Sequence, residues 1–269
     1  MIRVSNLSFQ YGESLHVFRG FDWQVERSDI WVVLGPSGCG KSTLLFLIAG
    51  LLQPNAGKIE VDSRPVRAPS PDVGLVLQDY ELLPWATVRE NASLGLRIER
   101  FNKRWNFSRA GNNAEFARSR SADTPGDVDE WLRQLGLAEV GGHYPGRLSG
   151  GQRQRTALAR TLAMNPKLVL LDEPFGALDA PTREALQDLT IQLAVSRGLT
   201  AVLVTHSIEE AAFMGRRILV LGTTPQLRAH VIDNPGAGSA RFRESAAFVR
   251  VCTELRAALD QSLVDGGMP

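Results

Sequence analysis

The chain has 269 residues, a formal net charge of +1 and two cysteines; 43% of its residues are hydrophobic and 22% are charged. This is the composition of an ordinary globular protein, and it excludes a disordered chain, a collagen and a disulfide-stapled scaffold. Because a near-neutral charge gives no extended positive field, we expect no nucleic-acid partner. The two cysteines form no pattern, which is typical of a reducing compartment.

Residues 1–30 alternate apolar with polar side chains and contain no long apolar run. We therefore expect neither a secretory signal nor a membrane anchor at the start of the chain. No later stretch approaches the roughly 20 apolar residues that a spanning helix needs. A function at a membrane would thus require a separate spanning subunit.

Short, unbroken apolar runs predict the strands of a parallel sheet that is covered on both faces. These runs lie at residues 30–34, 73–77, 168–171 and 201–204. Segments with helical periodicity lie between them, at 42–52, 150–164 and 182–196. The alternation predicts an α/β fold with a mostly parallel sheet.

Other segments predict additions to this core. Residues 1–30 and 57–69 alternate in the manner of an antiparallel β layer, and residues 87–148 read as a helical insertion. In the tail, Phe248, Cys252, Leu255 and Leu259 share one face of a helix expected over 241–264. The expected boundaries are 1–86 for the first part of the core, 87–158 for the helical subdomain, 159–225 for the rest of the core and 226–269 for the tail.

Within the helical insertion, residues 97–120 carry seven basic side chains against two acidic ones, with Gly, Asn and Ser between them. We interpret this stretch as a solvated, loop-like insertion. Contact with acidic lipid headgroups is the alternative.

Residues 35–42 read Gly-Pro-Ser-Gly-Cys-Gly-Lys-Ser, the G-x4-G-K-[ST] pattern, between a predicted strand and a predicted helix. Glycines let backbone N–H groups approach phosphate oxygens, and the helix adds its positive end. Lys41 supplies a charge for the β and γ phosphates, and the Ser42 hydroxyl suits Mg²⁺. The predicted nucleotide-binding residues are Gly35, Pro36, Ser37, Gly38, Cys39, Gly40, Lys41, Ser42 and Thr43.

Two further motifs carry chemistry. The apolar run at 168–171 delivers Asp172 and Glu173 to the carboxyl end of the sheet, where Asp172 suits Mg²⁺ and Glu173 can deprotonate an attacking water. At 148–152, Leu-Ser-Gly-Gly-Gln places a serine cap and two glycines at a helix start. This predicts a second anion-binding helix terminus.

With these motifs the chain resembles the nucleotide-binding subunits of ABC (ATP-binding cassette) transporters, whose LSGGQ signature is complete at 148–152. The resemblance implies a P-loop ATPase in which two copies pair head to tail around two ATP. It places Ser149, Gly150, Gly151 and Gln152 of one copy at the nucleotide of the other. It implies five more site residues, namely Tyr11 and Val17 at the adenine, Gln78 at Mg²⁺ and the attacking water, Asp179 in the loop to the partner copy, and His206 at the γ-phosphate.

The same resemblance implies catalysis by Glu173, His206, Lys41 and Gln78, with ATP and Mg²⁺ as cofactors. It also implies separate membrane permease subunits bound through the loop 79–85, an extracytoplasmic solute-binding protein as an indirect partner, and a peripheral location on the cytoplasmic face of the membrane. Leu83 and Trp85 are then exposed anchors for the permease; the alternative is that both pack inside the helical subdomain.

The Leu-Leu-Pro-Trp run at 82–85 and the chain length resemble importers of the nitrate, sulfonate and taurine group. This implies uptake of a small anionic or organosulfur solute. The alternatives are the cassette of an exporter and a soluble ABC ATPase that acts on nucleic acid.

Overall fold

The computed structural model describes residues 1–12, 15–109 and 127–265. The chain divides into two compact units, one formed by 1–78 and 167–269 and the other by 79–166. Within the described ranges, no helix combines the length and the apolar character that a membrane span requires.

The first unit is built on a six-stranded sheet with the strand order β10-β9-β3-β8-β7-β6. Its strands are β3 (Ile30–Leu34), β6 (Val73–Val76), β7 (Leu168–Asp172), β8 (Thr200–Thr205), β9 (Arg217–Val220) and β10 (His230–Asp233). All neighbours pair in parallel except β10, which pairs antiparallel with β9. Every residue of β3, β7 and β8 is buried, which explains their unbroken apolar runs and confirms the predicted α/β fold.

A second, antiparallel sheet of the same unit has the order β2-β1-β4-β5. It consists of β1 (Ile2–Tyr11), β2 (Leu15–Val25), β4 (Ala56–Val61) and β5 (Arg64–Pro65). In β1, buried Ile2 and Val4 alternate with more exposed residues, so one face of this sheet covers the core. The expected antiparallel layer is confirmed.

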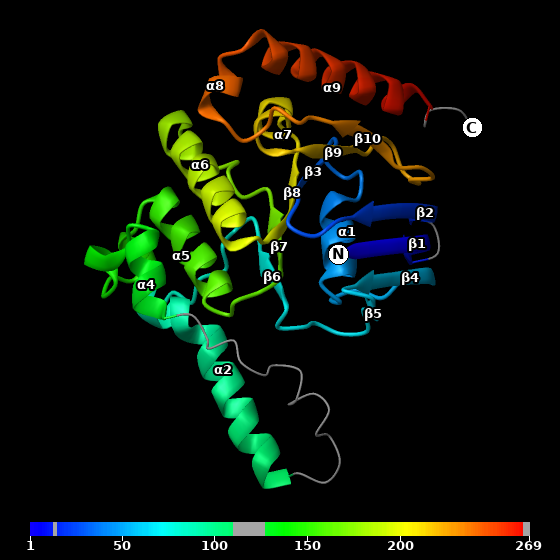
Figure 1. Ribbon diagram of the computed structural model, residues 1–269. Coiled ribbons are helices and arrows are strands. Elements are labelled where there is room, and N and C mark those ends of the chain that lie inside the picture. Colours follow the sequence, from blue (N-terminus) through cyan, green and yellow to red (C-terminus); the bar gives the residue numbers. More distant parts are fainter. Residues whose placement is uncertain (13–14, 110–126, 266–269) are drawn as a thin grey trace. The chain divides into compact units, whose positions relative to one another are not determined.

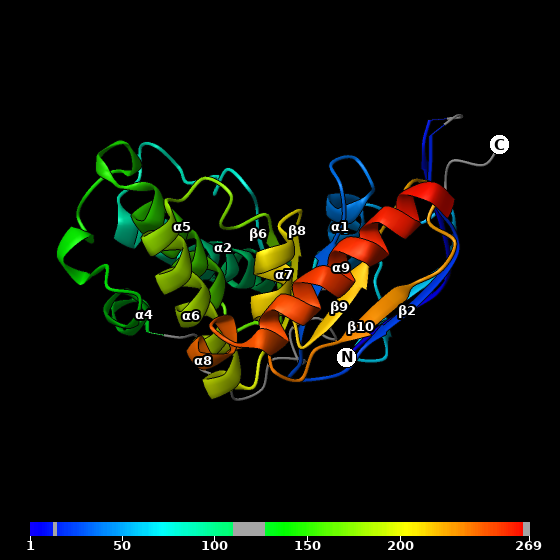
Figure 2. The same ribbon diagram turned by 90° about the horizontal axis from the view of Figure 1, so that it is seen from above.

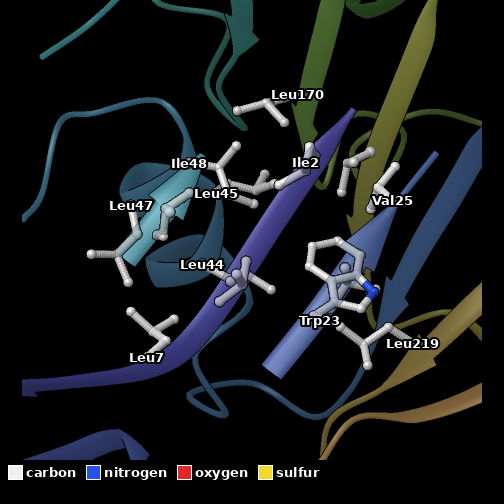
Figure 3. Packing of buried hydrophobic residues seen from close by; sticks show 14 of the residues in the cluster. Ile2, Leu7, Trp23, Val25, Leu44, Leu45, Leu47, Ile48, Leu170 and Leu219 are labelled. Carbon is white, nitrogen blue, oxygen red and sulfur yellow. The ribbon is translucent and has the colours of Figure 1, made fainter. Parts of the chain in front are cut away.

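Helix α1 (Lys41–Ile48) packs between the two sheets (Figure 3). Leu44, Leu45, Leu47 and Ile48 are each at most 1% exposed. They meet side chains of both sheets, among them Ile2, Leu7, Trp23, Val25, Leu170 and Leu219. Because α1 starts inside this apolar core, the segment before it has little freedom to move.

The remaining helices of this unit are α6 (Ala180–Arg197), α7 (Ile208–Met214), α8 (Ala240–Arg243) and α9 (Ala246–Asp265). Helix α9 packs against α7 and β9 (Figure 2). The predicted amphipathic tail helix is confirmed, with Leu255 fully buried. It starts at 246 rather than 241 because Ser239 caps the separate short helix α8, and Ser245 bonds to the Phe248 N–H at the start of α9.

The second unit is helical (Figure 1), with α2 (Val88–Arg109), α4 (Val128–Gln134) and α5 (Gly150–Leu162) and the short 3-10 turns η1 (Ala138–Val140) and η2 (Pro145–Arg147). Helix α2 packs against α4 and α5. The expected loop at 97–120 is wrong for 97–109, which continue α2, since no Gly or Pro interrupts this stretch and its Arg, Lys and Glu residues favour a helix. Residues 110–120 lie outside the described residues.

The packing around α1 predicts a large difference between two leucines of the same region. Leu44 is fully buried, whereas Leu51 is 54% exposed. Leu44→Ala should lower the free energy of unfolding by about 2–5 kcal/mol because it leaves a cavity between the sheets, whereas Leu51→Ala should change it by less than about 0.5 kcal/mol. Chemical denaturation measures both values, and equal losses would contradict the packing.

Candidate functional site

Four predicted site residues follow neighbouring strands at one edge of the parallel sheet. In the register of the sheet, Leu34 lies opposite Thr205, Asp172 opposite Val204, and Val76 opposite Leu171. The residues that follow each strand within two positions therefore lie at the carboxyl edge, the usual ligand site of such sheets. They are Gly35 after β3, Gln78 after β6, Glu173 after β7 and His206 after β8.

The phosphate-loop sequence 35–42 follows β3 and includes the first two residues of α1. The Lys41 side chain is only 4% exposed, and its Nζ donates to the carbonyl oxygens of Gly35 at 3.0 Å and Pro36 at 2.9 Å. No side chain among the described residues caps the start of α1, so the N–H groups of its first turn are left for an anion. The loop thus wraps around its own lysine.

Gly40 fixes how closely this loop lies on the antiparallel sheet. Its φ of 101° is in the left-handed region, and a Cβ here would lie 2.5 Å from Val17 Cγ1. Only glycine fits such a position. Val17, one of the two residues predicted at the adenine, is 3% exposed and packs against the loop at Gly40.

Tyr11, the other residue predicted at the adenine, lies at the end of β1 with 43% of its surface exposed. Its hydroxyl lies 3.3 Å from Thr43 Oγ1 in the first turn of α1. The ring of Phe9 meets it edge to face at 4.9 Å. An exposed aromatic surface therefore stands beside the phosphate loop.

Two carboxyl groups complete the edge. Ser42 Oγ donates to Asp172 Oδ1 at 3.0 Å, and burial raises the pKa of Asp172, an effect that the Ser42 hydrogen bond partly offsets. Glu173 adopts a left-handed φ of 42° and its N–H donates to Val204 O at 3.1 Å. The backbone of Glu173 is thus held by the neighbouring strand.

The Glu173 carboxylate lies between two basic side chains. Its Oε1 is 3.7 Å from Lys41 Nζ, and its Oε2 is 3.0 Å from His206 Nδ1. Glu173 is largely buried, whereas the His206 side chain is 56% exposed. Gln78 is also exposed and lies two residues beyond the end of β6. A cation, a carboxylate and an imidazole therefore meet at one point beside the phosphate loop.

Gln226 is a residue of this site that the sequence did not reveal. It is 5% exposed, and its Nε2 donates to Cys39 O of the phosphate loop at 3.3 Å and to Gly222 O at 2.9 Å. Its backbone N–H donates to Val17 O. One glutamine thus connects the phosphate loop, β2 and the segment after β9. A single Gln in an aperiodic segment gives no signal that would have found it.

The predicted trans residues lie at two helix N-termini, one in each unit. In the first unit, Asp179 caps α6 by accepting from the Thr182 N–H at 3.2 Å, a bond that lowers the pKa of Asp179. In the second unit, Ser149 and Gln152 form a reciprocal capping box at the start of α5, with Gly150 and Gly151 in its first turn. Ser149 and Asp179 are both exposed.

The loop 79–85 of the second unit is held in an unusual conformation. Tyr80 and Glu81 both have positive φ, and Arg160 donates to both of their carbonyl oxygens at 2.7 Å. The buried Asn91 accepts from Leu83 N–H and donates to Leu83 O. These contacts fix the loop from both ends.

This loop borders an apolar groove. Trp85 is 73% exposed, as the anchor interpretation requires, whereas Leu83 is half-buried. The groove has a volume of about 600 Å³ and is lined by Leu83, Trp85, Ala86, Glu90, Leu94, Arg97, Ile98 and Phe101.

Comparison with protein-family models matches residues 18–176 to the ABC transporter family. Among curated proteins, the chain is 40% identical over 229 residues to the taurine import ATP-binding protein of Rhizobium johnstonii, which covers 84% of this chain and 80% of the relative. It is 41% identical over 225 residues to the taurine import ATP-binding protein of Yersinia pestis, covering 84% and 81%.

Solved structures with this fold include a dimeric ATP-binding cassette, MJ0796, in a post-hydrolysis state bound to ADP and phosphate. It has a TM-score of 0.67 and 29% identity over 87% of this chain and 98% of that one. The cbiO1 protein of Clostridium perfringens, part of an ABC transporter complex, has a TM-score of 0.70 and 25% identity over 96% of both chains.

The raised pKa of Asp172 predicts a pH-dependent stability. Because the folded pKa exceeds the unfolded one, the folded state binds more protons between the two values, and the free energy of unfolding falls as the pH rises through that window. Asp172→Asn should make the nucleotide-free protein more stable at neutral pH and reduce this fall. Denaturation at acidic and neutral pH measures both effects. The exposed Asp260→Asn serves as the control, and identical behaviour of the two variants would contradict the burial effect.

Proposed function

Because the chain belongs to the ABC transporter family, we propose that it is the ATP-hydrolysing subunit of an importer for a small anionic or organosulfur solute. The observation that carries this proposal is the meeting of Lys41, Glu173 and His206 at one edge of the sheet beside the phosphate loop. The taurine-import relatives at 38–41% identity favour import over export.

ATP binds through the phosphate loop and Tyr11. The ammonium group of Lys41 exchanges its hydrogen bonds to the Gly35 and Pro36 carbonyls for hydrogen bonds to the β and γ phosphates. The loop N–H groups bind the remaining phosphate oxygens. The exposed ring of Tyr11 stacks on the adenine, with Val17 supporting the loop beneath. Ser37, Gly38, Cys39 and Thr43 complete the phosphate-binding segment.

Mg²⁺ fits the oxygen donors of this edge. Ser42 and Asp172 present a hydroxyl and a carboxylate 3.0 Å apart, which are the hard ligands that this ion prefers. We infer that Ser42, Asp172 and Gln78 hold it. When bound, Mg²⁺ neutralises charge on the β and γ phosphates.

Hydrolysis depends on whether the Glu173 carboxylate is available to bind a water molecule. Before ATP binds, its carboxylate faces Lys41 and His206. When the Lys41 ammonium binds phosphate oxygens instead, one oxygen of the Glu173 carboxylate becomes free. The carboxylate then orients a water molecule and removes a proton from it. His206 and Gln78 position the γ-phosphate and that water, while Lys41 stabilises the charge that develops on the transferred phosphoryl group.

A second copy completes the site. Two chains pair head to tail, so that Ser149, Gly150, Gly151 and Gln152 of one copy reach the γ-phosphate bound by the other, with Asp179 in the contact between them. Since these groups bind ATP only in the closed pair, ATP favours closure. Raising the closed fraction from about 1% to about 99% takes roughly 5.5 kcal/mol of differential affinity. Hydrolysis removes the bridging group and the pair opens.

Coupling to transport runs through the groove beside Trp85. Separate permease subunits insert a short apolar segment there, which places the chain peripherally on the cytoplasmic face of the membrane. An extracytoplasmic solute-binding protein acts on the permease. The apolar lining and the exposed Trp85 support this partner.

The role of Glu173 is tested by Glu173→Gln. ATP should still bind and ATP-bound dimers should accumulate, while steady-state hydrolysis falls by at least about 100-fold, because the general base is lost. Light scattering and a phosphate-release assay measure the two effects. Wild-type turnover in Glu173→Gln would refute the assignment.

The role of Lys41 is tested by Lys41→Ala. This variant should weaken ATP binding, as measured by titration.

The groove is tested by Trp85→Ala. Because Trp85 is exposed, the variant should keep the thermal stability of the wild type but lose most co-purification with the permease subunits, since removing an aromatic anchor costs about 2 kcal/mol or more. Leu227→Ala, which removes another exposed apolar side chain outside the groove, is the control. Equal recovery of the permease with both variants would rule out the groove.

A further inference from the structure

Glu210 is a buried carboxylate that the proposed mechanism does not use. It lies in α7, is 6% exposed, and its Oε2 accepts a 2.7 Å hydrogen bond from Thr205 Oγ1. Thr205 directly precedes His206. The same hydroxyl accepts from the Ser207 N–H at 3.0 Å, so Glu210 holds the side chain that in turn holds the backbone directly after His206.

The other carboxylate oxygen of Glu210 faces the helix that follows Asp179. Its Oε1 lies 3.9 Å from Arg183 Nε, and this buried Nε makes no hydrogen bond within the described structure. The Nη2 of Arg183 donates to Leu178 O at 2.7 Å, directly before Asp179. Arg183 therefore fixes the loop of Asp179 as Glu210 fixes that of His206.

A continuous polar connection thus runs from Thr205 through Glu210 and Arg183 to Leu178. Its two ends are short hydrogen bonds, and its centre is a 3.9 Å ion pair between the buried Glu210 and an Arg183 side chain that is 37% exposed. A buried carboxylate is costly without partners, so Glu210 depends on the Thr205 hydroxyl and on the charge of Arg183. Burial raises the pKa of Glu210, and the hydrogen bond from Thr205 and the charge of Arg183 partly offset this effect.

We propose that Glu210 and Arg183 are positioning residues that couple the His206 loop to the Asp179 loop. The inference rests on the proposed function, in which His206 lies at the γ-phosphate of its own chain and Asp179 reaches the site of the partner copy. The connection then joins the two ATP sites of a pair. A shift of one loop on ATP binding then moves the other, so that hydrolysis at one site depends on ATP in the other.

The connection is tested by steady-state ATP hydrolysis of the full chain over a range of ATP concentrations. Glu210→Gln, Arg183→Met and Thr205→Val each break one link. Each should lower kcat by about 10-fold or more, because a misplaced catalytic loop loses its alignment, while KM changes less than about twofold. The Hill coefficient should fall from above one in the wild type to about one, since the sites no longer communicate.

Two controls separate positioning from general damage. Thr205→Ser keeps the hydroxyl that Glu210 binds and should retain turnover and cooperativity, whereas Thr205→Val keeps the shape and loses both. Glu209→Gln removes the exposed neighbouring carboxylate, which bonds only to Ser207 Oγ among the contacts described, and should behave as the wild type. The double variant Glu210→Gln with Arg183→Met should be no worse than the worse single variant, because both act in one connection.

Several results would overturn the proposal. These are an unchanged Hill coefficient in all three variants, additive losses in the double variant, a KM that rises in step with the fall in kcat, or a wild-type Hill coefficient of one. If Glu210→Gln does not fold, the Thr205→Val and Thr205→Ser pair decides alone. A wild type that hydrolyses no ATP would defeat the proposed function itself, whereas normal turnover in the variants would defeat only the connection.

Discussion

The structure depends on a buried ammonium group that is held inside a glycine-rich loop. Lys41 is enclosed by its own loop and bonded to two carbonyl oxygens, with Glu173 nearby. A buried cation needs compensating partners, and these partners are groups that phosphate oxygens can replace. The loop can hold this arrangement because α1 is packed between two sheets and Gly40 lies directly on Val17. Packing in the core thus sets the geometry of the phosphate loop.

Sheet topology brings the chemistry to this point. Parallel strands place their carboxyl ends at one edge, so segments distant in sequence deliver Ser42, Asp172, Glu173 and His206 to one location. The raised pKa of Asp172 shows that burial of this carboxylate has a cost in stability. In the proposed function, a bound cation and phosphates offset this cost.

Local patterns in the sequence predicted the core and the motifs well. The run 30–34 and the glycine-rich segment 35–42 are strand and loop because their periodicity and residue types leave few alternatives. The helix at 97–109 was missed because charge and a few small residues suggested a loop, although the stretch has no helix breaker. Gln226 and Arg160 were not predictable, since each acts on a backbone carbonyl far away in sequence, and no local pattern encodes such contacts.

The most direct test of the central claim is a structure of the full chain with Mg²⁺ and ATP bound, trapped by Glu173→Gln. The account predicts that Lys41 Nζ leaves the Gly35 and Pro36 carbonyls for phosphate oxygens, and that Ser149 of a second copy lies at the γ-phosphate. A bound ATP beside a Lys41 still bonded to its carbonyls, or a nucleotide that no second copy approaches, would contradict the account.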